Sequence, residues 1–288
     1  RADLSVRIRE GSGVVLTFLY APADRPALVA KALAGTADVV IVDLEDAVAA
    51  DAKVQARAEV VGLLASPQPR VQIRINDVRT ACGQADLRAI GALCSGTAGI
   101  RVPKVESAVD VRDVAKAVPG VALHPLIDSA LGLERAYEIA SADPAVASVG
   151  LGEADLRADL GVSDEAGLAW ARSRLVVAAR AAGLPAPVQS VYTDFHDLEG
   201  LAESCRVGRS MGFRGRAAIH PAQLPVIEAA YRPTEEEVTA ANEVVAAAGV
   251  GAVALPDGRF VDEAVVRQAR SVLTDALRTP ATTPTMTP

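Results

Sequence analysis

The sequence contains few aromatic residues and few cysteines. Only 3% of the 288 residues are Phe, Trp or Tyr although 50% are hydrophobic, so aliphatic side chains must fill the core. The three cysteines, Cys82, Cys94 and Cys205, are an odd number at no metal-ligand spacing. This usage argues against a disulfide framework and a cysteine zinc site, and we expect three reduced thiols in a cytoplasmic protein.

The chain also lacks an excess of positive charge and any long apolar run. Its formal net charge is −7. A nucleic-acid partner requires a basic surface, so we expect no such partner. No apolar run reaches the ~18 residues of a membrane span. Residues 1–13 are rich in charge and contain no apolar signal-peptide core, and we expect no membrane association.

Short apolar segments alternate with helical patterns along most of the chain. The expected strands are residues 14–20, 38–43, 71–75, 99–102, 121–127, a run before Asp155, 187–191 and 215–219. Such alternation predicts an α/β protein with a parallel sheet, and eight units over this length predict a (β/α)8 TIM barrel. No complete G-x-G-x-x-G pattern follows the first strand, which argues against a dinucleotide-binding fold.

The barrel accounts for residues 14–230 and leaves a C-terminal remainder. Residues 231–278 show helical patterns beyond the barrel, and we predict a helical extension or lid there. An appendage with an apolar stripe is typical of a packing or oligomerisation element. Residues 279–288 have low complexity, which predicts a disordered tail.

The stretch from Val121 to Asp155 contains two carboxylates in a β-α-β pattern. An apolar run ends at Asp128, a helical segment follows, and a second apolar run leads to Asp155. Ligands of α/β proteins bind at the carboxyl ends of the strands. Two convergent carboxylates suit a hard cation that keeps open positions, Mg²⁺ or Mn²⁺. The alternative is that both aspartates cap the helices that follow them.

Other charged residues follow predicted strands and, in a barrel, would face the same mouth. Glu45 and Asp46 follow the second strand, Arg74 ends the third, and Lys104 follows the fourth. Acidic groups beside a guanidinium are costly to gather unless they bind something. For Lys104, an ion pair with Glu106 or with a barrel acid is as consistent with the sequence as contact with a substrate.

Three further polar residues come from predicted strands or their ends. Gln189 and His220 belong to the ends of the seventh and eighth strands and are expected at the mouth. The proline after His220 favours a structural hydrogen-bonding role for that histidine. His124 lies inside an apolar strand, which favours a buried histidine with satisfied hydrogen bonds.

The segment Asp38 to Arg57 contains a specific pattern, Asp43-Leu44-Glu45-Asp46 followed by Lys53 and Ala56-Arg57. This pattern resembles the citrate lyase beta subunit group of the malyl-CoA lyase and aldolase superfamily, with Ala47 in place of the family glycine. Further family motifs follow in order, namely Tyr20-Ala21-Pro22, Arg74-Ile75-Asn76, Pro103-Lys104-Val105-Glu106, Asp155-Leu156, Asp197-Leu198-Glu199-Gly200-Leu201, Ile219-His220-Pro221-Ala222-Gln223 and Phe260-Val261-Asp262.

The resemblance implies a Mg²⁺-dependent carbon–carbon lyase that cleaves a 3-hydroxyacyl-CoA thioester into acetyl-CoA and a keto acid. Citramalyl-, malyl- and 3-hydroxy-3-methylglutaryl-CoA are the implied substrates. The implied metal ligands are Asp128 and Asp155. Asp262 would act as general acid and base, delivered over the mouth by a neighbouring subunit of a homotrimer or hexamer.

Elementary chemistry assigns roles to the remaining residues at the mouth. Arg74 is always charged and carries a fork of donors, so it suits an enolate oxygen or a carboxylate of the substrate. Glu45 and Asp46 would orient metal-bound waters and Arg74. Lys104 and Asp155 complete the predicted substrate-binding set.

Two departures from the family pattern leave other functions open. Asp128 stands where the family has a glutamate, and Gln189 where an aspartate is usual. One alternative is a metal-dependent aldolase of free hydroxy-keto acids. Another is a catalytically impaired subunit that binds CoA esters.

Overall fold

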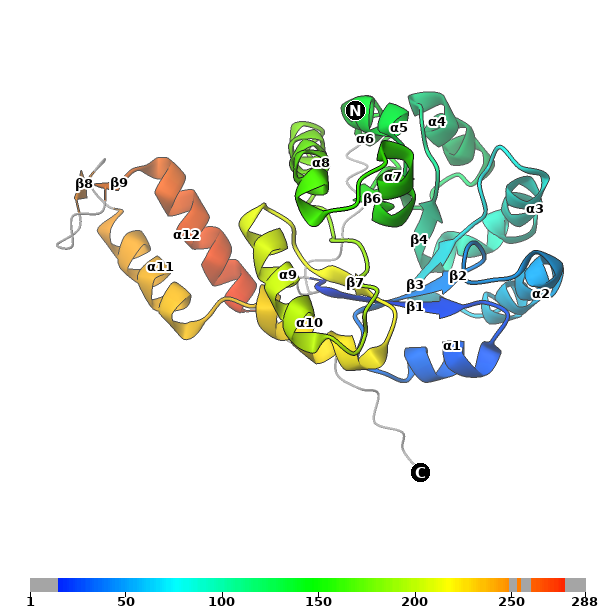
Figure 1. Ribbon diagram of the computed structural model, residues 1–288, viewed down its shortest axis with the longest axis horizontal. Coiled ribbons are helices and arrows are strands. Elements are labelled where there is room, and N and C mark those ends of the chain that lie inside the picture. Colours follow the sequence, from blue (N-terminus) through cyan, green and yellow to red (C-terminus); the bar gives the residue numbers. More distant parts are fainter. Residues whose placement is uncertain (1–14, 249–252, 255–259, 278–288) are drawn as a thin grey trace.

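The computed structural model describes residues 15–248, 253–254 and 260–277. Its centre is a seven-stranded parallel sheet in the order β6-β5-β4-β3-β2-β1-β7 (Figure 1). The strands are β1 (Thr17–Pro22), β2 (Val39–Asp43), β3 (Gln68–Arg74), β4 (Thr97–Val102), β5 (Leu123–Ile127), β6 (Gly150–Leu151) and β7 (Arg216–Ala218). The sheet curls, and its last strand in sequence, β7, pairs with its first, β1.

Helices follow the strands and lie around the outside of the curved sheet (Figure 1). Helix α4 begins with a capping box in which Ser107 and Asp110 bond to each other's backbone N–H groups, as its sequence favours. The ten helices of the barrel part are α1 (Pro26–Leu33), α2 (Lys53–Leu63), α3 (Ala81–Ile90), α4 (Ala108–Ala117), α5 (Ala130–Glu134), α6 (Ala136–Ala140), α7 (Glu153–Leu160), α8 (Ala169–Ala181), α9 (Leu198–Ser210) and α10 (Leu224–Tyr231).

Two apolar layers hold the barrel part together. The larger one lies between sheet and helices and consists almost entirely of Ala, Val, Leu and Ile side chains, as the scarcity of aromatic residues requires. The smaller one lies on the inner side of the sheet and contains Phe18, Val39, Ile41 and Ala217. A parallel sheet covered on its outer face by helices and filled on its inner face is the TIM-barrel arrangement, so the predicted fold class is confirmed.

The seventh predicted strand, residues 187–191, is the main difference from the expected barrel. Gln189 makes a single parallel bridge to Arg216, and within the described ranges no strand ladder joins this segment to β6. Pro185 and Pro187 precede this bridge and have no N–H to donate to a ladder. The barrel is therefore least regular between its sixth and seventh units.

The C-terminal extension is a helical hairpin that projects from the barrel beside α9 and α10 (Figure 1). It consists of α11 (Glu235–Ala247), α12 (Glu263–Ala276) and a short antiparallel pair, β8 (Val253–Ala254) with β9 (Phe260–Val261). The two helices share a small apolar core of their own, formed by Ala241, Val244, Val261, Val266 and Ala269. The predicted disordered tail, residues 279–288, lies outside the described residues.

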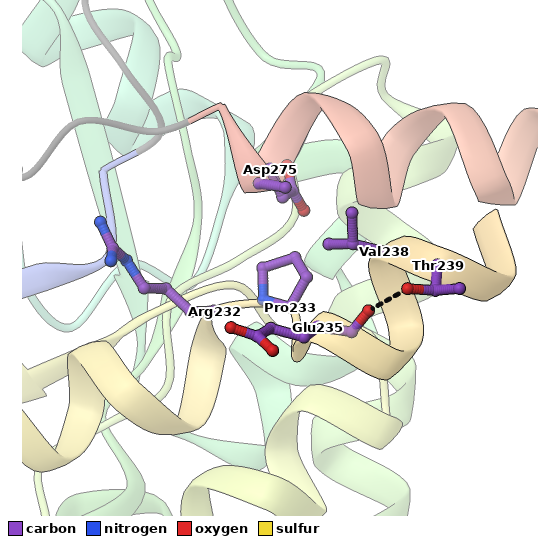
Figure 2. A pocket seen from close by; sticks show the side chains of 7 residues that line it. Arg232, Pro233, Glu235, Val238, Thr239 and Asp275 are labelled. Atoms are coloured by element: carbon purple, nitrogen blue, oxygen red, sulfur yellow. Dashed lines mark hydrogen bonds between the residues drawn. The ribbon is translucent and has the colours of Figure 1, made fainter. Parts of the chain in front are cut away.

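Ion pairs and a cavity mark the base of the hairpin. Arg209 of α9 pairs with Glu237 of α11 at 2.9 Å, and Arg214 pairs with Asp275 of α12. Figure 2 shows the cavity of about 460 Å³ that lies where α11 begins and α12 ends. None of the predicted site residues lines this cavity, so it is not the predicted active site.

All three cysteines are free thiols, as expected. Cys94 and Cys205 are buried, and Cys82 is partly buried. None of the helices in the described ranges is both long and apolar enough to cross a membrane.

Candidate functional site

The loop after β2 is fixed by the carboxylate of Asp43, the last residue of that strand. Its two oxygens accept the backbone N–H groups of Glu45 at 2.9 Å and Ala47 at 3.1 Å. The ammonium of Lys53 donates to the carbonyl oxygens of Leu44 and Glu45, at 2.8 and 2.6 Å. The hydrogen bonds of Asp43 and Lys53 therefore fix the loop. They hold the Glu45 side chain at the strand end, where it is only 5% exposed.

Arg74, at the end of β3, contacts three carboxylates. Its Nε and Nη2 form a fork on Asp43 at 2.7 and 2.6 Å, and its Nη1 reaches Glu45 at 3.0 Å and Asp46 at 3.4 Å. The Arg74 Cζ lies 5.0 Å from the centre of the Tyr20 ring. The sequence predicted Arg74, Glu45 and Asp46 at one mouth, and the structure brings them together. The fork on Asp43 was missed, because a strand-end aspartate gives no signal of which side chain it holds.

Lys104 joins this group to the predicted metal ligands. Its φ of 55° is the positive value that non-glycine residues rarely adopt, and it points the Lys104 N–H at Asp128 Oδ2, 2.9 Å away. Its ammonium lies 2.5 Å from Asp155 Oδ2 and 3.6 Å from Glu45 Oε1. Of the two ion pairs that the sequence left open, the one with a barrel acid is present. Glu106 pairs with Arg79 instead, at 2.5 Å.

Asp128 follows β5, is 7% exposed, and does not cap the next helix. The side chain of Ser129 caps α5 by accepting the N–H of Gly132. Asp128 Oδ1 is buried and has no hydrogen-bond donor. Gly152 leaves room for this oxygen, since a Cβ there would lie only 2.0 Å away from it. The helix-cap alternative is therefore wrong for Asp128.

Asp155 lies in the first turn of α7 rather than directly at a strand end. The strand β6 ends at Leu151, and Gly152 is the N-cap of α7. Asp155 is thus not a cap, and a carboxylate in the first helical turn is favoured by the helix dipole. Its side chain is 47% exposed and faces the Lys104 ammonium.

Burial controls the charge of the carboxyl groups in the site. Desolvation raises the pKa of Glu45 to about 7, against the lowering effect of Arg74. Desolvation also raises the pKa of Asp128, although the Lys104 N–H and ammonium favour its charged form. Burial alone would lower the pKa of Lys104, but the hydrogen bond to Asp155 and the charge of Glu45 outweigh it and raise this pKa.

The donor set fits a hard divalent cation. Asp128 Oδ1 and Glu45 Oε1 are buried carboxylate oxygens without hydrogen-bond donors. Glu45 Oε1 has the Lys104 ammonium 3.6 Å away, whereas a buried and unpaired Asp128 Oδ1 is costly unless a positive group approaches it. Within the described ranges no group of three or more His, Cys, Asp or Glu side chains is arranged to hold an ion. Mg²⁺ is usually held by one or two carboxylates and keeps several waters, so a pair of carboxylates suffices.

The expectation that Gln189 faces the mouth is wrong. Its side chain is 2% exposed and packs against Gly208 of α9, where a Cβ would lie 2.1 Å from the amide carbon. The Tyr231 hydroxyl donates to Gln189 Oε1 at 2.5 Å, and the Gln189 amide donates to the Ser204 carbonyl at 3.2 Å. Side chains alternate between the faces of an extended segment, and this residue falls on the helix-facing side.

His220 and His124 have structural partners, in agreement with their sequence context. His220 accepts the N–H of Ala222 at 3.2 Å and stacks on Phe195 with 4.9 Å between ring centres. His124 is buried and lies 2.8 Å from the Ser148 hydroxyl. Burial and the nearby Arg101 charge lower the pKa of His124 to about 4, so it is neutral.

Asp262 lies in the hairpin and not in the mouth of its own barrel. It is the N-cap of α12, where its carboxylate accepts the N–H of Val265 at 2.9 Å. The neighbouring β9 and the start of α12 lie at the outer end of the hairpin, remote from the sheet (Figure 1). Within one chain Asp262 therefore does not join the other predicted residues.

These features define an α/β-barrel protein whose strand ends gather carboxylates, a guanidinium and an ammonium around one mouth. Residues 16–221 match the HpcH/HpaI aldolase/citrate lyase family, and the chain belongs to this family. The resemblance inferred from the sequence motifs is thus confirmed, and the protein is a member of a family of enzymes.

Known relatives share most of the length of the chain. A (3S)-malyl-CoA thioesterase of Cereibacter sphaeroides is 37% identical over 274 residues, covering 90% of this chain and 93% of the relative. A citrate lyase subunit beta-like protein of Mycobacterium tuberculosis is 39% identical over 266 residues, covering 89% and 93%. The crystal structure of the M. tuberculosis protein CitE with magnesium, acetoacetate and coenzyme A has a TM-score of 0.81 and 37% identity, covering 91% and 98%.

Gly152 offers a test of the Asp128 pocket that alters no charged residue. In Gly152→Ala the new Cβ displaces the Asp128 carboxylate, and we expect Mg²⁺ binding to weaken roughly 10- to 100-fold, as for other residues that support a metal ligand. Isothermal titration with Mg²⁺ measures this. Gly62→Ala is the matched control, because no atom lies within 4 Å of its new Cβ. Unchanged Mg²⁺ affinity in Gly152→Ala would exclude Asp128 as a ligand.

Glu45 makes the stability of the metal-free protein depend on pH. Its pKa is about 7 in the folded state against 4.5 for the ordinary side chain, so the folded state binds more protons between these values. Its stabilising contribution is complete below pH 4.5 and is lost as the pH rises through 7, by roughly 3 kcal/mol. Urea unfolding from pH 5 to 8 should show this loss in the wild type and not in Glu45→Gln. Equal pH profiles would contradict the raised pKa.

Proposed function

We propose that this protein is a Mg²⁺-dependent carbon–carbon lyase that cleaves a 3-hydroxyacyl-CoA thioester into acetyl-CoA and a keto acid. The observation that carries the proposal is the buried, donor-free oxygen of Asp128 beside Asp155, Arg74 and Lys104 at one mouth. The substrate class is supported by family membership and by relatives named for malyl-CoA and citrate lyase. Citramalyl-, malyl- and 3-hydroxy-3-methylglutaryl-CoA are the candidate substrates.

Asp128 and Asp155 are the residues that would hold the ion, Mg²⁺ or alternatively Mn²⁺. When bound, a divalent ion supplies a Lewis acid that lowers the pKa of the substrate hydroxyl and polarises the keto acid. The relative of known structure that contains magnesium and coenzyme A supports this assignment. Glu45 and Asp46 would orient the remaining ligands of the ion.

The cationic residues of the mouth would bind the substrate and its developing charge. Cleavage leaves an enolate on the acetyl thioester, and Arg74 would stabilise its oxygen because the guanidinium is fixed in place by Asp43. Lys104 would bind the substrate carboxylate after exchanging its present partner Asp155. The Arg74 guanidinium is already held in place by Asp43, so it needs little reorganisation when charge develops.

A proton must also be delivered to the acetyl carbon. Asp262 would deliver it from the hairpin of a neighbouring subunit in a homotrimer or hexamer. The position of Asp262 at the outer end of a projecting hairpin supports delivery to a different barrel. Closure by this hairpin would exclude water from the mouth.

Thioester hydrolysis is a second candidate, favoured by one relative and one residue. The relative is the (3S)-malyl-CoA thioesterase, and the residue is Glu45, whose pKa of about 7 suits a general base that activates water. Lyase and thioesterase differ in their products, since hydrolysis releases free CoA and a hydroxy acid.

A substrate panel with and without Mg²⁺ tests the proposed function. The panel contains the three CoA thioesters and a set of free hydroxy-keto acids, and the loss of each substrate is followed. We expect thioesters alone to be consumed, and only with Mg²⁺. Turnover of free acids alone would favour an aldolase of hydroxy-keto acids. Binding of thioesters without any turnover would favour an impaired CoA-ester-binding subunit.

A further inference from the structure

Arg101 is a charged residue on the inner side of the sheet, on the strand next to Arg74. It belongs to β4, pairs in register with Arg74, and is 6% exposed. Its Nε donates to Gln72 Oε1 of β3 at 2.7 Å, and its Cζ lies 5.3 Å from the Phe18 ring of β1. Two other strands separate β4 from β1 in the sheet, so this contact crosses the interior of the barrel.

The charge of Arg101 has no counter-ion in the part of the chain that the structure describes. No carboxylate of the described residues lies within ion-pair distance of its guanidinium. Its polar neighbours are Gln72 and Tyr20, which are not carboxylates, and Arg74 adds a like charge. Burial and the Arg74 charge lower the pKa of Arg101. A guanidinium nevertheless stays charged in proteins because its ordinary pKa is so high. A buried charge without a partner is strongly unfavourable unless a ligand supplies one.

Arg74 and Arg101 differ in the number of carboxylates that contact their guanidinium groups. Arg74 donates to Asp43, Glu45 and Asp46, so three carboxylates of the chain itself surround it. Arg101 lies directly beside it and has none. Of these two guanidinium groups, an anionic group that enters the mouth therefore finds only that of Arg101 uncompensated by a carboxylate of the described chain. The two residues are expected to serve different parts of a substrate.

We propose that Arg101 is an anion subsite that receives a second carboxylate on the keto-acid half of the substrate. The enzyme would accordingly favour an acyl group that releases a keto diacid, such as oxaloacetate, over the three candidates named above, which release the keto monoacids pyruvate, glyoxylate and acetoacetate. This inference rests on the proposed function and adds the chemical class of the substrate to it. A planar guanidinium suits this task because it binds a carboxylate through two parallel hydrogen bonds.

The experiment compares two keto acids that differ by one carboxylate, oxaloacetate and pyruvate. Freshly dissolved oxaloacetate or pyruvate is titrated into the wild type, Arg101→Met and Arg101→Lys in the presence of saturating Mg²⁺. Binding is measured by calorimetry. We expect the wild type to bind oxaloacetate roughly 10- to 100-fold more tightly, the value of a charge-assisted hydrogen bond. Arg101→Met should lose this preference and keep its pyruvate affinity, whereas Arg101→Lys should keep part of it. Arg88→Met, at an exposed position of α3, controls for net charge.

The melting temperature of Arg101→Met separates an anion subsite from an arginine with a purely structural role. Loss of a structural arginine would lower the melting temperature. Removal of an uncompensated buried charge is neutral or stabilising, so ligand-free Arg101→Met should melt no lower than the wild type. Equal binding of both keto acids by the wild type would overturn the subsite. So would an equal loss of both affinities in Arg101→Met, or a lowered melting temperature. If the wild type binds neither keto acid with Mg²⁺, the proposed function itself fails, and the subsite with it.

Discussion

Asparagine in place of Asp155 is expected to lower the Mg²⁺-dependent turnover of the thioester roughly 10²- to 10⁴-fold. Loss of one of two metal ligands removes several kcal/mol of transition-state stabilisation, and each 1.4 kcal/mol corresponds to about tenfold in rate. The substitution keeps the shape of the side chain and its place in the first turn of α7. Turnover is measured at saturating and at limiting Mg²⁺, because a weakened site recovers in part at high metal concentration.

Lys104 provides the control that separates a metal ligand from an ion-pair partner. Its ammonium lies 2.5 Å from Asp155, so it competes with a cation for the same oxygen. We expect Lys104→Met to strengthen Mg²⁺ binding while it lowers turnover, and Asp155→Asn to weaken both. Asp113→Asn, an exposed carboxylate that pairs with Lys116, should change neither. Unchanged Mg²⁺ affinity in Asp155→Asn would show that this residue only holds Lys104.

Asparagine in place of Asp262 is expected to lower turnover by roughly 10²- to 10⁴-fold, the usual contribution of a general acid or base. Mg²⁺ affinity should stay at the wild-type value, because Asp262 lies in the hairpin and the predicted ligands lie in the barrel. Asparagine retains an oxygen that accepts the Val265 N–H, so the start of α12 is preserved.

Co-expression of Asp262→Asn and Asp155→Asn subunits tests whether the hairpin serves a neighbouring barrel. If it does, a barrel with intact Asp155 receives a hairpin with intact Asp262 at roughly a quarter of the sites of a random mixture, and activity returns. If each hairpin serves its own barrel, every site lacks one residue and the mixture stays inactive. An inactive mixture of properly assembled oligomers would therefore contradict delivery by a neighbouring subunit.

The sequence predicted the strand-end residues well because the chemistry of a parallel barrel fixes where such residues point. Glu45, Asp46 and Arg74 follow strands whose apolar runs are unmistakable, and they meet as expected. Asp128 and Lys104 also meet, although through the Lys104 backbone N–H. A positive φ at a lysine has no sequence signature, so this contact could not be predicted.

The remaining differences arise where strand patterns are short or mixed. Two prolines precede Gln189 and its segment forms only a single bridge, so the strand pattern did not reveal that its side chain points toward α9. Asp155 was placed at a strand end because the apolar run before it continues through the turn, whereas α7 already begins at Glu153. Arg101 was overlooked inside a run of apolar residues. Strict alternation along β4 would have placed it on the same inner face as Gly99.

The most direct measurement is the ratio of acetyl-CoA to free CoA formed from one consumed thioester, with Mg²⁺ and with EDTA. We expect acetyl-CoA and keto acid in equal amounts with Mg²⁺, and no product with EDTA. Free CoA with the intact hydroxy acid as the sole products would contradict carbon–carbon cleavage and establish a thioesterase. Equal rates of acetyl-CoA formation with Mg²⁺ and with EDTA would contradict a metal site at Asp128 and Asp155.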